Sequence, residues 1–362
     1  MIKNRVYIIF LSALFLFISS CQEIYNPENL DSSKRIVVIN GIITNKIEPY
    51  RVSIFYANAF NNNSKEPITG AKVYIKDDED NSKLLKDFGN GNYYSDTAEI
   101  IGTIGRKYFI HVELSDGSVY ESIPEIMYAP PQVDSMYAEI GKHDQVEYDS
   151  YGDIVITPYK GLDVKIDFNS TTKGYYRVSS NVITQKSHIE STSFGSVDVF
   201  CWYNSNLNDF PDVVSALPDG LKYVVRDHDM GFLALVNGTD TRIVNRVTYS
   251  PEQIAGWVVS TTVSTISADA YSYYQSVANQ LEAANRIFDP VPSQIVGNIH
   301  CINNPSKIVL GLFEVSSNVL VNEAFSWNDG SKIYHKKNLM SYPSVIVDGC
   351  LNNSYPAFWV QL

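Results

Sequence analysis

The stretch KYFIHVELSDGSVYESI, residues 107–123, decides the fold class of this chain. In it, two runs that alternate apolar and polar residues flank the pair Asp116 and Gly117. Alternation with a period of two residues is typical of a β-strand that buries one face. Asp-Gly between two such runs favours a tight turn, because glycine readily adopts the positive φ that the turn needs. The stretch therefore predicts a β-hairpin.

Four similar runs come before this hairpin and extend the β pattern toward the N-terminus. They are RIVVINGIIT (35–44), YRVSIFYA (50–57), AKVYIKD (71–77) and GNYYSD (91–96). The alternation predicts that Ala71, Val73 and Ile75 face a core, and Gly89 and Gly91 predict a tight turn before the last run. Short strands in this number, within about a hundred residues, are typical of an immunoglobulin-like β-sandwich.

The pattern breaks at Pro130 and Pro131, because a Pro-Pro step favours stiff, extended backbone. We therefore expect the sandwich to span residues 35–130 and a larger β-rich domain to span residues 131–362. Strand-like runs of this second domain are 132–140, 161–169, 174–184, 197–204, 221–227, 241–249, 294–302, 307–316 and 317–325.

One helix is expected in the second domain, near residues 267–288. Ser267 and Asp269 suit its first turn, and the apolar residues that follow recur with the helical period until Pro290. The chain as a whole is therefore predicted to be mainly β with one main helix.

The N-terminus has the pattern of an export signal. Lys3 and Arg5 precede an apolar run, residues 6–18, which reaches only about 20 Å as a helix and cannot cross about 30 Å of hydrocarbon. The residues Ile-Ser-Ser before Cys21 resemble a bacterial lipobox. We therefore expect residues 1–20 to be removed as a lipoprotein signal peptide. Lipid on Cys21 would anchor the protein, with residues 21–34 as a polar tether.

Several motifs carry family resemblances. EPITGAKVYIKD, FGNGNYYSD and GTIGRKYFIHVELSDGSVY resemble transthyretin-like or carboxypeptidase-regulatory-like sandwiches. Together with the lipobox, CWYN, ISADAYSYYQSVANQL, FDPVPSQIVGNIHCINNPSKIVLGLFEVS and PAFW, they resemble the Bacteroidota outer-membrane lipoprotein family catalogued as domain of unknown function 4249. The resemblance implies a surface or periplasmic lipoprotein of the outer membrane, and we favour the cell surface over the periplasmic face. It also implies an accessory partner of a TonB-dependent receptor, and no established activity.

The cysteines other than Cys21 are odd in number, which predicts one disulfide and one free thiol in an oxidising compartment. Members of the family often end with a denser cysteine cluster than the single Cys350 of this chain. Against that background we favour pairing of Cys201 with Cys350, with Cys301 left over. Neighbours on a strand point to opposite faces, so His300 beside Cys301 does not predict a metal site.

The composition argues against a nucleic-acid partner and against disorder, and it leaves two explanations of the tyrosine content open. A net charge of −12 argues against a nucleic-acid partner, which needs a basic face. Hydrophobic residues make up 44% of the chain, which argues for a folded protein rather than a disordered one. The 25 tyrosines fit either a β-rich exported protein or a binding surface with aromatic platforms.

No stretch of the sequence predicts an enzyme, a metal or a cofactor. In RDHDMG, residues 226–231, an extended backbone would put both carboxylates on one face and the imidazole on the other, so a solvated loop is favoured over a functional site. DDEDNS, residues 77–82, lacks the glycine and glutamate of a calcium loop and predicts a solvated hairpin tip. Thr97 and Ser135 lie in tripeptides that resemble Bacteroidota O-glycosylation sites.

The sequence therefore favours a surface-anchored, non-enzymatic lipoprotein that captures or presents a ligand for a TonB-dependent receptor. One alternative is a structural or adhesive cell-surface module without a transport role. A hydrolase is another, although the six histidines are scattered singly along the chain.

Overall fold

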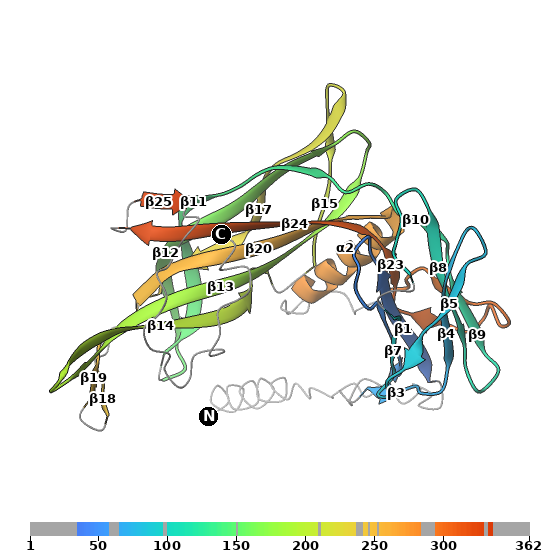
Figure 1. Ribbon diagram of the computed structural model, residues 1–362, viewed down its shortest axis with the longest axis horizontal. Coiled ribbons are helices and arrows are strands. Elements are labelled where there is room, and N and C mark those ends of the chain that lie inside the picture. The colour runs from blue at the N-terminus through green and yellow to red at the C-terminus, as the bar shows by residue number, and fades with distance from the viewer. Residues whose placement is uncertain are drawn as a thin grey trace, which may run out of the picture. The chain divides into compact units, whose positions relative to one another are not determined.

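The computed structural model describes residues 35–57, 65–96, 100–149, 151–208, 211–236, 242–244, 247–251, 253–283, 294–328 and 332–335. Over these residues the chain is mainly β, with strands β1 to β25 and helix α2 (Figure 1). This confirms the prediction that the chain is mainly β with one main helix. Among the same residues, no helix is both long enough and apolar enough to span a bilayer.

Two sheets share the first hydrophobic core, as in a sandwich. One contains β1 (Ile36–Ile43), β2 (Arg51–Ala57), β3 (Glu66–Pro67), β6 (Lys86–Asp87), β7 (Asn92–Tyr94), β22 (Val309–Leu310) and β23 (Phe313–Val315). The other contains β4 (Lys72–Asp77), β5 (Ser82–Leu84), β8 (Lys107–Glu113), β9 (Val119–Ser122), β10 (Glu125–Ile126) and β21 (Ile299–Cys301). Val73 and Ile75 are fully buried in this core, as the alternation predicts.

The hairpin predicted at residues 107–123 is present as β8 and β9. The two strands pair antiparallel, and Gly117 in the turn has a φ of 83°. The Asp116 carboxylate accepts a hydrogen bond from the Ser118 N–H at 2.8 Å, which holds the turn. Gly91, at a φ of 71°, also requires glycine, because a Cβ there would lie 2.2 Å from the Ile54 carbonyl oxygen.

The chain returns to this first core after residue 294. β22 and β23 run parallel to β1, with Val309 opposite Val37 and Phe313 opposite Gly41, and β21 pairs antiparallel with β9. Figure 1 shows the orange-red β23 beside the blue β1. The sequence interpretation assigned these residues to the second domain, whereas strand pairing joins them to the sheets of the first. Periodicity identifies a strand but does not identify the strand that it pairs with.

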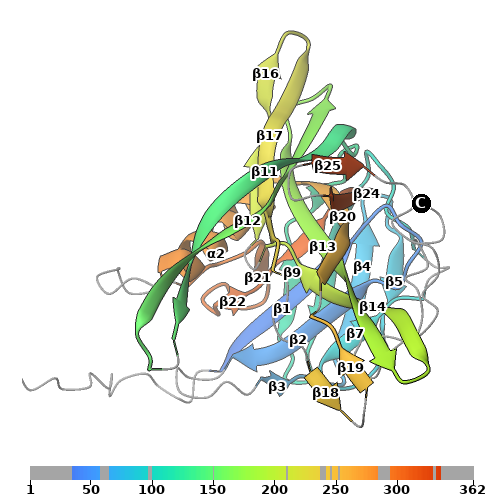
Figure 2. The ribbon, with the colours of Figure 1, turned by 90° about the vertical axis from the view of Figure 1, so that its left-hand side faces the viewer.

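Two further sheets share the second core. One contains β11 (Gln132–Tyr148), β12 (Ile154–Ser170), β16 (Leu217–Asp219) and β17 (Lys222–Ala234). The other contains β13 (Tyr175–Thr192), β14 (Gly195–Asn206), β15 (Asp212–Ser215), β18 (Arg242–Val244), β19 (Val247–Tyr249), β20 (Gln253–Ile266), β24 (Ser317–Asn328) and β25 (Lys332–His335). Trp257 and Tyr176 are the largest fully buried side chains of this core. β16 and β17 form a hairpin whose tip is at the top of Figure 2.

Several strands of these sheets are longer than the sequence predicts, and β20 was not predicted at all. β12 begins at Ile154, seven residues before the predicted start at Gly161, and it contains Pro158. Pairing of β12 with β17 ends at Gly161, so Pro158 lies where the edge of β12 is open and a missing N–H is tolerated.

Helix α2 (Ala268–Ala283) begins where the sequence predicts. The Ser267 hydroxyl accepts a hydrogen bond from the Ala270 N–H at 3.0 Å, which caps the first turn. Ala270 is fully buried against Ile266 and Leu312, so the start of the helix is fixed to the loop between β22 and β23. Residues 284–288 of the predicted helix lie outside the described residues.

Candidate functional site

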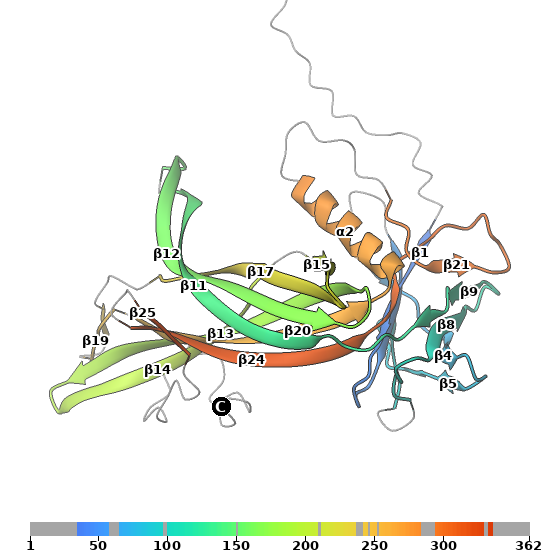
Figure 3. The ribbon, with the colours of Figure 1, turned by 90° about the horizontal axis from the view of Figure 1, so that it is seen from above.

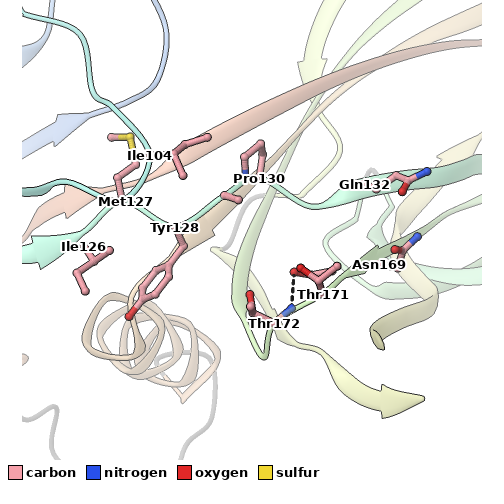
Figure 4. A pocket seen from close by; sticks show the side chains of 12 residues that line it. Ile104, Ile126, Met127, Tyr128, Pro130, Gln132, Asn169, Thr171 and Thr172 are labelled. Carbon is pink, nitrogen blue, oxygen red and sulfur yellow. Dashed lines mark hydrogen bonds between the residues drawn. The ribbon is translucent and has the colours of Figure 1, made fainter. Parts of the chain in front are cut away.

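One candidate site is a cleft of about 320 Å³ where the two cores meet, here called the junction cleft (Figure 4). Its walls come from the loop before β8, from β10 and the segment after it, and from the turn between β12 and β13. The lining residues are Ile104, Gly105, Ile126, Met127, Tyr128, Ala129, Pro130, Gln132, Asn169, Ser170, Thr171 and Thr172. The predicted domain junction at Pro130 thus forms part of one wall.

The two sides of the junction cleft differ in chemistry. Ile104, Ile126 and Tyr128 give the first side an apolar surface, and Met127 behind them is fully buried. The amide of Gln132 and the hydroxyls near Thr171 give the other side hydrogen-bonding groups. Tyr128 is the sole residue with an ionisable side chain among those that line the cleft. The lining can therefore hold a neutral ligand by apolar contact and hydrogen bonds.

A polar cluster, here called the junction network, adjoins the cleft at Glu125, the residue before Ile126 in β10. It consists of Glu125, Arg177, Ser267, Tyr274, Asn298 and Glu314. These residues come from β10, β13, the start of α2, α2 itself, the segment before β21, and β23. The network therefore ties the first core to the second, and it fixes the positions of the cleft walls.

Glu125 directly precedes Ile126, a lining residue of the cleft, in β10. One of its oxygens, Oε1, accepts hydrogen bonds from the Ser267 hydroxyl at 2.9 Å and from the Asn298 amide at 3.0 Å. Within the described part of the chain, the other buried oxygen, Oε2, has no hydrogen-bond partner. Burial raises the pKa of Glu125 to about 7, although both hydrogen bonds act to lower it.

Arg177 and Glu314 form a buried ion pair at the centre of the network. Two guanidinium nitrogens donate to the two carboxylate oxygens, at 2.8 and 3.1 Å, and the Tyr274 hydroxyl donates to the same carboxylate at 2.6 Å. Glu314 is 1% exposed. Burial acts to raise the pKa of Glu314, but the Arg177 charge outweighs it and the pKa is lowered. The carboxylate therefore stays ionised inside the protein.

One further hydrogen bond joins the segment between β10 and β11 to the second core. The Thr265 hydroxyl, at the end of β20, donates to the Ala129 carbonyl oxygen at 3.0 Å. Ala129 lies between Tyr128 and Pro130, both of which line the cleft. This hydrogen bond holds that wall of the cleft in place.

The structure does not bring the ionisable residues of RDHDMG together, and it places them in strand β17 rather than in a loop. Asp227 has a φ of 52° at an irregularity in the pairing with β12, and it accepts a hydrogen bond from the Tyr137 hydroxyl. His228 instead contacts the Asp212 carboxylate, at 2.9 and 3.0 Å. Asp229 accepts a hydrogen bond from the Gly231 N–H at 2.9 Å. These side chains have separate structural partners.

The acidic run at residues 77–82 forms the tip of the β4–β5 hairpin, as predicted. Arg106, from a neighbouring loop, makes ion pairs with Asp77, Asp78 and Glu79 at 2.7 to 2.9 Å. The hydrogen bond from Arg106 is the largest cause that lowers the pKa of Asp78. Among the described residues, no group of three or more potential ligands is arranged to hold a metal ion.

The remaining predicted sites are only partly described. Cys201 is buried and disulfide-bonded, and Cys301 is a buried free cysteine. Cys21, Thr97 and Cys350 lie outside the described residues. The pairing of Cys201 with Cys350 therefore stays a prediction. Ser135 is exposed in β11.

A thiol titration distinguishes the possible disulfide partners of Cys201. If Cys350 is the partner and Cys21 carries lipid, the native protein should show no reactive thiol, because Cys301 is buried. Denaturation without a reductant should then expose one thiol, which peptide mass spectrometry should assign to Cys301. A reactive Cys350 in the denatured protein would contradict this pairing.

The fold defines a mainly β protein, built from sandwich-like sheets with a helix against the second pair. The chain belongs to the family described as Domain of unknown function (DUF4249), whose profile matches residues 22–319. The match includes both sheets of the first core, the strands that return to it, and α2. It confirms the family that the sequence motifs indicate. A search of the curated proteins found no match.

Proposed function

We propose that this protein is a non-enzymatic accessory protein that captures or presents a ligand for a TonB-dependent outer-membrane receptor. In this proposal, lipid on Cys21 anchors it to the outer membrane of a Bacteroidota cell, at the cell surface. The anchor is supported by the leader sequence, and the receptor is supported by the family resemblance. The first two sheets are taken to be an immunoglobulin-like sandwich, supported by their shared core and antiparallel hairpins.

The junction cleft is the observation that supports ligand capture. Its lining offers apolar surface on one side and amide or hydroxyl groups on the other. Protein ligand sites commonly combine such an apolar surface with a few polar groups that fix orientation. Arg177 and Glu314 of the junction network are not among the residues that line the cleft, which suits a structural role. A neutral ligand with both apolar and hydrogen-bonding groups fits this lining.

Purification from gently solubilised outer membranes tests this proposal. We expect the wild-type protein to carry a TonB-dependent receptor, identified by mass spectrometry, and to release a bound small molecule in native mass spectrometry. Thr171→Trp would place a large side chain in the cleft at an exposed turn, and it should lower ligand occupancy by about tenfold while the receptor stays attached.

Two controls make this test specific. Thr192→Trp puts the same side chain at the exposed β13–β14 turn and should leave ligand occupancy unchanged. Cys21→Ala should release the protein from the membrane fraction. A wild-type preparation with neither receptor nor ligand would refute the proposed function. Full ligand occupancy in Thr171→Trp would show that the junction cleft is not the ligand site.

A structural or adhesive role is the second candidate, and exposed hairpin tips favour it. Phe194, in the β13–β14 turn, is 98% exposed, and Leu221, in the β16–β17 turn, is 97% exposed. Apolar tips of this kind suit contact with another surface. In that case, deletion of the gene would change surface attachment and leave nutrient uptake unchanged.

A further inference from the structure

A second cleft, of about 500 Å³, lies between helix α2 and the sheet that contains β1 and β2, and we call it the arginine cleft. Figure 3 shows α2 close to β1. The two clefts share no lining residue, and the volume is typical of small-molecule sites. None of the described residues that line it is an aspartate or a glutamate, although the chain has a net charge of −12. The lining includes Arg51, Arg177, Tyr273, Tyr274, Val277 and Leu312.

The fold puts Arg51 on the face of this sheet that points away from the first core. In β2, Val52 is fully buried in that core, and the alternation of a strand sends Arg51 to the opposite face. In β23, Phe313 points into the core, so Glu314 lies on that same opposite face. The Tyr274 hydroxyl of α2 donates to Glu314 at 2.6 Å. The helix is thereby held over the face that carries Arg51.

Arg51 is a cation without an anionic partner in the described part of the chain. Its Nε donates to Asn92 Oδ1 on the neighbouring strand β7, at 2.8 Å, and it forms no ion pair with a described carboxylate. Asn92 is neutral, so it orients the guanidinium without cancelling the charge. The two terminal nitrogens remain, and such a planar fork matches two oxygens of a carboxylate or a phosphate.

The second arginine and the tyrosines form a fixed wall of this cleft. Nε and Nη2 of Arg177 donate to Glu314, which cancels the charge and leaves Nη1 as a donor. The guanidinium lies 5.5 Å from the centroid of the Tyr274 ring, and the Tyr273 ring packs edge to face against Tyr274, at 5.6 Å between centroids. Val277, one turn farther along α2, adds apolar surface. The cleft thus combines one net positive charge with aromatic and apolar surface.

We propose that the arginine cleft binds a small organic acid, with its carboxylate or phosphate group held by Arg51 and a ring or short apolar body against Tyr273 and Val277. A cationic ligand would be repelled by Arg51. A neutral ligand would make weaker hydrogen bonds to the guanidinium than an anion does, because charge-assisted hydrogen bonds are the stronger ones. The proposal rests on neither the receptor nor the junction cleft, since the two clefts have separate linings.

Fluorine NMR of the full-length protein in detergent tests this site, with 4-fluorobenzoate as the probe. The fluorine signal should broaden on binding, and a titration gives the dissociation constant. 4-Fluorobenzamide has nearly the same shape without the charge, so it should bind about tenfold more weakly. Acetate and inorganic phosphate lack the ring and should compete poorly. Benzoate and phenyl phosphate should displace the probe, and the stronger competitor shows which anionic group the site prefers.

A substitution at Arg51 locates the binding. Arg51→Gln removes the charge and keeps an N–H that can donate to Asn92, and it should weaken probe binding about tenfold. In wild type, the NMR signal of the Arg51 Nε–H should shift as the probe is added. Lys76→Gln is the matched control, because Lys76 is also a cation beside a tyrosine, 6.0 Å from the Tyr74 ring centroid, but it lies in β4 of the other sheet. It should bind the probe as wild type does.

The outcomes separate this site from the junction cleft. Thr171→Trp, which fills the junction cleft, should leave probe binding unchanged, so either site can fail without the other. Loss of probe binding in Thr171→Trp would place the acid in the junction cleft and would overturn the proposal. Unchanged binding in Arg51→Gln, equal binding of 4-fluorobenzamide, or no probe binding at millimolar concentration would also overturn it. The urea unfolding midpoint of Arg51→Gln should stay near that of wild type, because Arg51 is exposed.

Discussion

Glu314→Gln is expected to lower the free energy of unfolding by about 3 kcal/mol, the lower end of the usual cost of leaving one member of a buried ion pair without its partner, because the Arg177 side chain left behind is 21% exposed. The substitution keeps the size of the side chain and an oxygen that can accept from the Tyr274 hydroxyl. It removes the negative charge that Arg177 contacts at 2.8 Å, inside a site where Glu314 is 1% exposed. Urea denaturation followed by tryptophan fluorescence measures the loss.

Removing both charges should cost much less than removing one. In Arg177→Met/Glu314→Leu no buried charge is left without a partner, so most of the stability should return. Lys72→Gln breaks the exposed pair with Glu113, whose charged atoms are 3.5 Å apart, and it should leave the unfolding curve nearly unchanged. A loss below about 1 kcal/mol in Glu314→Gln would contradict a buried, structural role for this pair.

The parts of the fold that depend on neighbouring residues could be predicted from the sequence. A few adjacent residues are enough to predict each of three features: the turn at Asp116 and Gly117, the burial of Val73 and Ile75, and the helix cap at Ser267. In these places local propensity and the final structure agree, because the side chain that gives the signal also makes the contact. The family could also be predicted, because the resemblance depends on local motifs in a fixed order, and the family profile matches residues 22–319.

Contacts between distant segments could not be predicted in this way. The apolar runs that became β22 and β23 indicated strands, but nothing in their spacing showed that they would pair with β1. Arg177 and Glu314 are 137 positions apart, so neither could be recognised as a partner of the other. The junction cleft and its network arise from this return of the chain, which is why sequence analysis missed both.

Two other differences have local causes that could have been recognised. Residues 253–266 are rich in valine and threonine, a composition that favours strands, and they form the central strand β20. In residues 226–231, His228 and two acidic residues suggested a loop, yet the flanking valines pair with β12 and hold the segment as part of β17. Concentrated charge indicated exposure correctly but not the backbone conformation.

Glu125 should make stability depend on pH between about 4.5 and 7. Because burial raises its pKa from the ordinary 4.5 to about 7, the folded state binds a proton that the unfolded state has already released at intermediate pH. The free energy of unfolding should therefore fall as the pH rises from about 4.5 to about 7, by about 3 kcal/mol in total. Above pH 7 the ionised carboxylate has one oxygen without a hydrogen-bond partner among the described groups.

Glu125→Gln should remove this part of the pH dependence, because the amide cannot ionise and its oxygen can still accept from Ser267 and Asn298. Other carboxylates titrate in both proteins, so the informative quantity is the difference between the two curves of unfolding free energy against pH. That difference should favour the variant progressively between pH 4.5 and 7 and then level off. Glu282→Gln, at an exposed position late in α2, should follow wild type. A constant difference for Glu125→Gln would mean that Glu125 is already ionised in the folded protein at acidic pH, and that the junction network accommodates its charge.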